Sequence, residues 1–100
     1  MPELHIALEE GFEGDDVVVD VDGDEVYQGQ NVHTRYQIGL ADTVDVTVEA
    51  GTRDIRVRVA TREIDQTFRV EVADHLWFGV SISEEDQLRE RTSAETFRYA

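Results

Sequence analysis

The fold class follows from two neighbouring stretches, Val44-Asp45-Val46-Thr47-Val48-Glu49 and Ile55-Arg56-Val57-Arg58-Val59. In both, apolar and polar residues alternate with a period of two, which is typical of β-strands that bury one face. We expect the two stretches to pair as a hairpin, with Asp45 and Glu49 of one strand opposite Arg56 and Arg58 of the other. Each pair of opposite charges across the strands would add roughly 0.2 to 1 kcal/mol to stability.

The same alternation continues on both sides of this segment. Toward the N-terminus, Asp22-Gly23 follows an apolar run and predicts a type I′ hairpin turn. We expect a second turn at Gly29-Gln30-Asn31 and a third at Ser83 to Gln87. Further strands are predicted at residues 4–8, 17–21, 24–28, 32–38, 68–72, 76–82 and 88–92, with a final short edge strand through Phe97 and Tyr99.

These patterns predict one all-β domain over residues 1–100, with very little helix. Eight or nine short strands with regularly spaced turns favour an antiparallel β-sandwich, immunoglobulin-like or related. Hydrophobic residues make up 40% of the chain, enough for a core, and the absence of cysteine excludes disulfides and thiolate metal sites. We expect no cofactor.

The charge balance is strongly acidic, because 23 acidic residues stand against nine arginines and no lysine, giving a net charge of -14. Nucleic acid and anionic membranes are excluded as partners, since both require a basic surface. One explanation of this composition is a halophile surface, on which dense carboxylates keep the protein solvated in concentrated salt. The equal alternative is an ordinary acidic protein from a GC-rich genome that encodes arginine in place of lysine.

The first ten residues contain no basic region and no long apolar run, so we expect no signal peptide. No apolar stretch approaches the roughly 18 residues of a membrane helix. The simplest expected location is the cytoplasm.

The acidic turn segment carries Asp20, Asp22 and Asp24, whose carboxylates suggest a calcium site. The spacing differs from an EF-hand, since Gly23 is fourth rather than sixth and the twelfth position is Asn31. We therefore favour a solvated hairpin turn. An irregular calcium site that adds acids of the preceding loop is the alternative.

Residues suited to catalysis or to zinc binding are dispersed. His5, His33 and His75 lie on separate segments without an i, i+2 or i, i+4 pair, so a zinc site would need an unpredicted cross-strand cluster. No nucleophile elbow surrounds any serine, and we expect no enzymatic activity.

Trp77 is the residue that most strongly suggests binding. If Leu76 and Phe78 contribute to the core, alternation places Trp77, Gly79 and Ser81 on the outer face of their strand. Trp77 and Ser81 are the candidate ligand or partner residues, with open room for a flat ligand above Gly79. The alternative is that a loop or the C-terminal tail covers Trp77.

The leading hypothesis is a noncatalytic binding or scaffold module for a protein or carbohydrate partner. A calcium-dependent binding domain is the alternative, and a small enzyme comes third. We also expect a homodimer through a sheet edge, at the first strand (Leu4 to Leu8) or the last (Leu88 to Thr92), or through an apolar face.

Residues 17–59 resemble a PEGA-type domain, a small β-sandwich module. The matching residues are Val21-Asp22-Gly23, Val26, Gly29, Val46-Thr47-Val48-Glu49-Ala50-Gly51 and Ile55-Arg56-Val57-Arg58-Val59. The Thr-Pro expected after the second glycine is missing. The resemblance implies a noncatalytic interaction module, usually attached to secreted or surface proteins, and it carries no catalytic residues.

Overall fold

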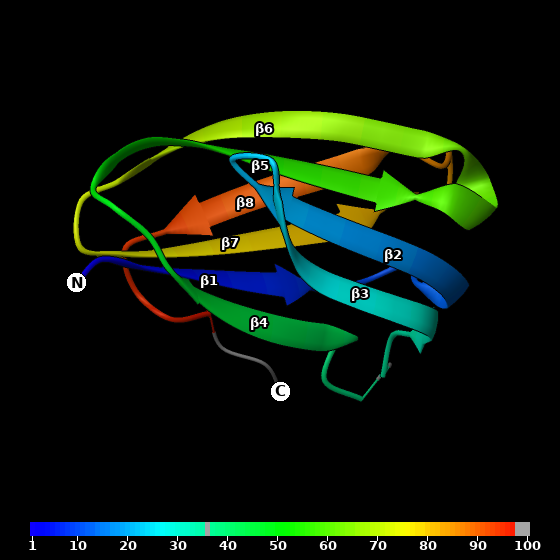
Figure 1. The fold of residues 1–100 in the computed structure, drawn as a ribbon. Helices are drawn as coiled ribbons and strands as arrows, with labels where there is room; N and C mark the ends of the chain where they lie inside the picture. The colour runs from blue at the N-terminus through cyan, green and yellow to red at the C-terminus, as the bar shows by residue number, and fades with distance from the viewer. Residues whose placement is uncertain (36, 98–100) are drawn as a thin grey trace.

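The computed structural model describes residues 1–35 and 37–97 (Figure 1). Within them the chain is all-β, and its one helical element is a three-residue 3₁₀ turn. The predicted all-β class and low helix content are confirmed. The elements are β1 (Glu3–Leu8), β2 (Glu13–Val21), β3 (Asp24–His33), β4 (Asp42–Thr47), β5 (Gly51–Val59), η1 (Ala60–Arg62), β6 (Ile64–Val72), β7 (His75–Ile82) and β8 (Leu88–Ser93).

The strands form two four-stranded sheets, ordered β4-β1-β7-β8 and β3-β2-β5-β6 (Figure 1). Neighbouring strands are antiparallel except for β1 and β7, which are parallel. Alternate residues of both sheets share one hydrophobic core. Its fully buried side chains include Leu4, Ile6, Leu8, Phe12, Val17, Val19, Ile55, Val57, Val59, Val72, Phe78 and Val80.

The predicted Asp22-Gly23 turn is confirmed. Both residues have positive φ, 49° and 87°, as a type I′ turn requires, and β2 and β3 pair on either side of it. The turn from Ser83 to Gln87 is also present, closed by a backbone hydrogen bond from Ser83 N to Gln87 O (2.8 Å).

The predicted hairpin of residues 44–59 is wrong. β4 pairs with β1 in one sheet, whereas β5 pairs with β2 and β6 in the other. Arg56 therefore binds Asp65, and Arg58 binds Asp20. Alternation specifies the buried face of a strand, but a short connection can carry the chain across to the other sheet and give each arm a different partner.

The predicted break at Gly29-Gln30-Asn31 is also wrong. β3 continues through these residues to His33, and irregularities in its pairing with β2, together with a positive φ of 56° at Asn31, absorb them. The strand expected at 32–38 is replaced by the end of β3 and a turn at residues 37–39. The predictions for Tyr36 and Tyr99 lie outside the described residues, and Phe97 is not in a strand.

β1 lies inside its sheet, between β4 and β7, so its predicted place at an edge is wrong. β8 ends the same sheet, in agreement with its prediction as an edge. β1 was predicted at an edge because its parallel partner, β7, lies far away in sequence. Parallel pairing of this kind has no local sequence signal.

Arg62 links the two sheets at one end of the molecule. Its guanidinium binds both carboxylate oxygens of Asp15 (2.9 and 3.0 Å), the Gly11 carbonyl (3.0 Å) and Asp86 (2.7 Å). Asp15 also accepts a hydrogen bond from the Thr61 hydroxyl (2.7 Å). One side chain therefore connects β2 of one sheet with the β7–β8 turn of the other.

The excess of carboxylates predicts a salt effect. Repulsion acts over a Debye length of about 10 Å at 0.1 M, so salt should stabilise the fold by screening it. Exposed ion pairs lose strength too, but each is worth only about 0 to 1 kcal/mol. We expect Tm to rise from low salt to about 1 M NaCl, and equally in KCl because screening depends on ionic strength. A flat or falling Tm, measured by scanning fluorimetry, would contradict this expectation.

Candidate functional site

The parallel register of β1 and β7 brings an unusual group of side chains onto one surface. Glu3 lies opposite His75, and His5 lies opposite Trp77. Leu4, between Glu3 and His5, and Phe78, which follows Trp77, are fully buried in the core, and Leu76, between His75 and Trp77, packs against it. Because successive side chains of a strand point to opposite faces, these four residues project from the outer face of the sheet.

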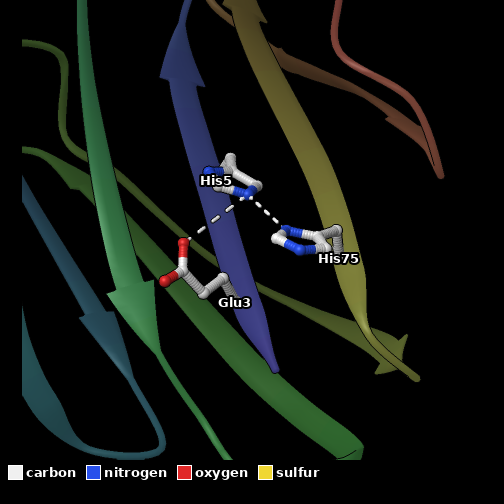
Figure 2. Close-up of side chains that lie close together, drawn as sticks. All are labelled: Glu3, His5 and His75. Carbon is white, nitrogen blue, oxygen red and sulfur yellow. Dashed lines mark hydrogen bonds and ion pairs between the residues drawn. The ribbon is translucent and has the colours of Figure 1, made fainter. Parts of the chain in front are cut away.

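His5 lies at the centre of this group. Its Nε2 is 3.0 Å from Nδ1 of His75 and 3.9 Å from a carboxylate oxygen of Glu3 (Figure 2). Its other ring nitrogen, Nδ1, is 2.7 Å from Asp45 Oδ1 on β4. The His5 side chain is 17% exposed, against 41% for Glu3 and 70% for Asp45. His5 is therefore more enclosed than either carboxylate beside it and is held at both ring nitrogens.

Trp77 packs against both histidines. Its ring is stacked on His5 at 4.4 Å between centroids, with an interplanar angle of 16°, and on His75 at 5.6 Å and 21°. We call these three residues the imidazole–indole cluster. His5 and Trp77 also line a pocket of about 130 Å³ together with Thr96 and Phe97, so the C-terminal segment lies beside the indole. Trp77 is accordingly half-buried.

The space beside Trp77 differs from the expectation. A Cβ added at Gly79 would lie 2.6 Å from Cδ of Glu9, whose carboxylate covers the glycine and is held by Arg91 Nε (3.0 Å). The predicted open room above Gly79 is therefore filled. Ser81 accepts a hydrogen bond from the Glu10 amide (3.2 Å).

The aspartates considered for calcium have other partners. Asp20 is buried and bound by Arg58 (2.7 Å), and Asp22 accepts bonds from Arg53 and the Asp54 amide, each at 2.9 Å. Asp24 is exposed at the start of β3. Among the described residues, these carboxylates do not form a group close enough to hold a metal ion.

The one group of potential metal ligands found in residues 1–35 and 37–97 is Glu3, His5 and His75, whose ligand atoms all lie within 4.8 Å of one another. His33 lies on the other sheet and contacts Asn31 (3.0 Å). Sequence reasoning treated the cross-strand histidine cluster as unfavoured. The only signal was indirect: His5 lies on the outer face of the predicted strand 4–8, and His75 immediately precedes the predicted strand 76–82. The register that joins the two histidines is not visible in the sequence.

Comparison with models of known protein families and with curated proteins finds no match to this chain. None of its described helical segments is long and apolar enough to cross a bilayer.

Proposed function

We propose that this protein is a noncatalytic binding module whose contact surface is the outer face of the β4-β1-β7-β8 sheet. The observation that supports the proposal is the imidazole–indole cluster itself. Its rings stack on one another, so they lose little conformational freedom when a partner covers them. Rigid aromatic side chains with polar edges are typical anchors of protein interfaces.

The stacking favours a protein partner over a carbohydrate. A sugar platform works best with a broad, free aromatic face, whereas the Trp77 ring already stacks on His5 and, at a longer distance, on His75. What the cluster offers is the edges of its rings, the small pocket beside Phe97, and the polar atoms of Thr43 and Asp45 that line it. With a net charge of -14, the module is complementary to a basic partner surface.

We further propose that the two sheets form a β-sandwich, since both contribute inner faces to one core. The strand orders 4-1-7-8 and 3-2-5-6 differ from the constant immunoglobulin pattern, which favours a related sandwich. The PEGA-type resemblance stays a prediction, as does the cytoplasmic location. A homodimer of such a module would pair through β8, the one predicted edge that ends a sheet.

Replacing Trp77 tests the proposed surface. Wild-type protein would be screened against a displayed random peptide library and a glycan array. We expect basic peptides to bind, and Trp77→Ala to weaken them by roughly thirtyfold or more, as loss of an interface anchor of about 2 kcal/mol does. Arg56→Ala, on the outer face of the other sheet, is the control and should bind like wild type.

Two outcomes would contradict the proposal. One is peptide binding that Trp77→Ala leaves unchanged in a folded variant. The other is wild-type tryptophan fluorescence that is blue-shifted and shielded from acrylamide, because a fully covered indole cannot contact a partner. Binding of glycans alone would move the assignment from a protein to a carbohydrate partner.

A further inference from the structure

We propose that Glu3, His5 and His75 bind a divalent transition-metal ion of the zinc class. The donor atoms are a Glu3 carboxylate oxygen, His5 Nε2 and His75 Nδ1, brought together by β1 and β7 (Figure 2). Two imidazoles and one carboxylate form a recurrent zinc ligand set, with a water in the fourth position. This site is a property of the chain beyond the proposed binding of a partner and does not depend on it.

The distances fit an ion between the three side chains. Tetrahedral ligand atoms at 2.0 to 2.1 Å from zinc lie about 3.4 Å apart. The two imidazole nitrogens are 3.0 Å apart, and His5 Nε2 is 3.9 Å from Glu3. Small rotations of the partly exposed Glu3 and the exposed His75 side chains would equalise these separations, since their strand backbones are already in register.

His5 already has the proton arrangement that a ligand needs. With its Nδ1–H donating to Asp45, the lone pair of Nε2 points toward His75. A carboxylate that holds the far nitrogen of a ligating histidine fixes its tautomer and raises its basicity. Without a metal, His75 Nδ1–H completes the hydrogen bond to His5, and on binding this proton moves to the Nε2 of His75, which leaves Nδ1 free to coordinate.

The surroundings select the class of ion. Nitrogen donors suit zinc and its first-row neighbours, whereas calcium and magnesium require mainly oxygen. The negative net charge attracts any cation, so charge alone does not discriminate among them. The exposure of His75 leaves the fourth position open to solvent.

Isothermal titration with ZnCl₂ tests the site, using protein without a histidine tag and freed of metal with EDTA. We expect one zinc ion per chain. His75→Gln replaces an exposed side chain, so it should fold normally and lose binding by at least tenfold. His33→Gln is the matched control, because it removes an imidazole from the other sheet and should leave the affinity unchanged.

Trp77 provides a second readout. The indole is stacked on His5, so Co²⁺ in the site should quench its fluorescence, and Zn²⁺ should reverse the quenching by displacement. Asp45→Asn, which weakens the hold on His5 Nδ1, should reduce zinc affinity by about 10- to 100-fold. CaCl₂ added at the same concentrations should give neither heat nor displacement.

Absence of heat and of quenching in the wild type would overturn the proposal. So would an unchanged affinity in His75→Gln, or a loss in His33→Gln. These results stand apart from the peptide screen, because they are measured on the metal alone and the variants that remove a ligand keep Trp77.

Discussion

Gly11→Ala should destabilise the protein by more than about 3 kcal/mol, because the substitution combines backbone strain with a collision. Gly11 has a φ of 89°, a conformation that costs an L-residue roughly 1 to 2 kcal/mol. A Cβ at this position would also strike the backbone carbonyl of Ile82, with its carbon at 2.8 Å. That strand is fixed by the hydrogen bond from Ile82 N to Glu10 O (2.8 Å), so it cannot easily move away.

Gly23→Ala is the matched control for this substitution. Gly23 has nearly the same φ, 87°, but a Cβ there meets no described atom within 4 Å. It should cost only about 1 kcal/mol, since the strain is partly offset by the lower entropy of the unfolded chain. Urea unfolding gives both free energies. Equal losses in the two variants would show that the contact with Ile82 contributes nothing.

Asp15→Ala should give the second large loss, about 2 to 4 kcal/mol of unfolding free energy. The Asp15 side chain is 4% exposed and Arg62 20%, and removal of the carboxylate leaves the guanidinium with the Gly11 carbonyl and Asp86. Because the Arg62 guanidinium keeps these contacts and is partly exposed to water, the expected loss of unfolding free energy is smaller than for breaking a fully buried ion pair. Asp65→Ala is the control, because it removes a similar bidentate contact, between Asp65 and Arg56. Both of these side chains are about half exposed, so this substitution should change the unfolding free energy little.

The Asp15 interaction also predicts an acid dependence. Burial by itself would raise the pKa of Asp15, but hydrogen bonds from Arg62, Thr61 and the Glu13 amide outweigh it and hold this pKa below 3.8. The contribution to stability is therefore fully present above the unfolded value of 3.8 and is lost as pH falls through the folded pKa. Wild-type stability, measured by urea unfolding between pH 5 and about 2, should fall more steeply than that of Asp15→Ala. Parallel curves would contradict this assignment.

The sequence predicted the strands well and their partners poorly. Alternation depends on the burial of one face, which is local, and the Asp22-Gly23 turn depends on backbone conformations that few residue pairs adopt. The pairing of strands that are far apart in sequence produces no comparable local pattern of residues. The outward position of Trp77 could therefore be predicted, whereas the contact between His5 and His75 could not.

The filling of the space above Gly79 is a related case. A glycine beside a tryptophan favours an open surface, but the same missing Cβ is what lets the Glu9 carboxylate lie against the strand. The choice between these interpretations depends on a residue that comes 70 positions earlier. The sequence near Gly79 therefore indicates the space above the glycine but not that Glu9 fills it.

The parallel pairing of β1 with β7 has a consequence for the order of folding. Residues 3–8 hydrogen-bond to residues 42–47 on one side and 75–80 on the other, so the strand at the start of the chain cannot complete its sheet until the seventh strand is available. Forming contacts of such long sequence separation requires the chain to close large loops, and this costs conformational entropy before the contacts stabilise the fold. Folding of proteins rich in such contacts is slow, on the order of milliseconds to seconds. The β2–β3, β5–β6 and β7–β8 hairpins need only local closure. We therefore expect the surface that carries His5 and Trp77 to form late, after the hairpins on which it depends.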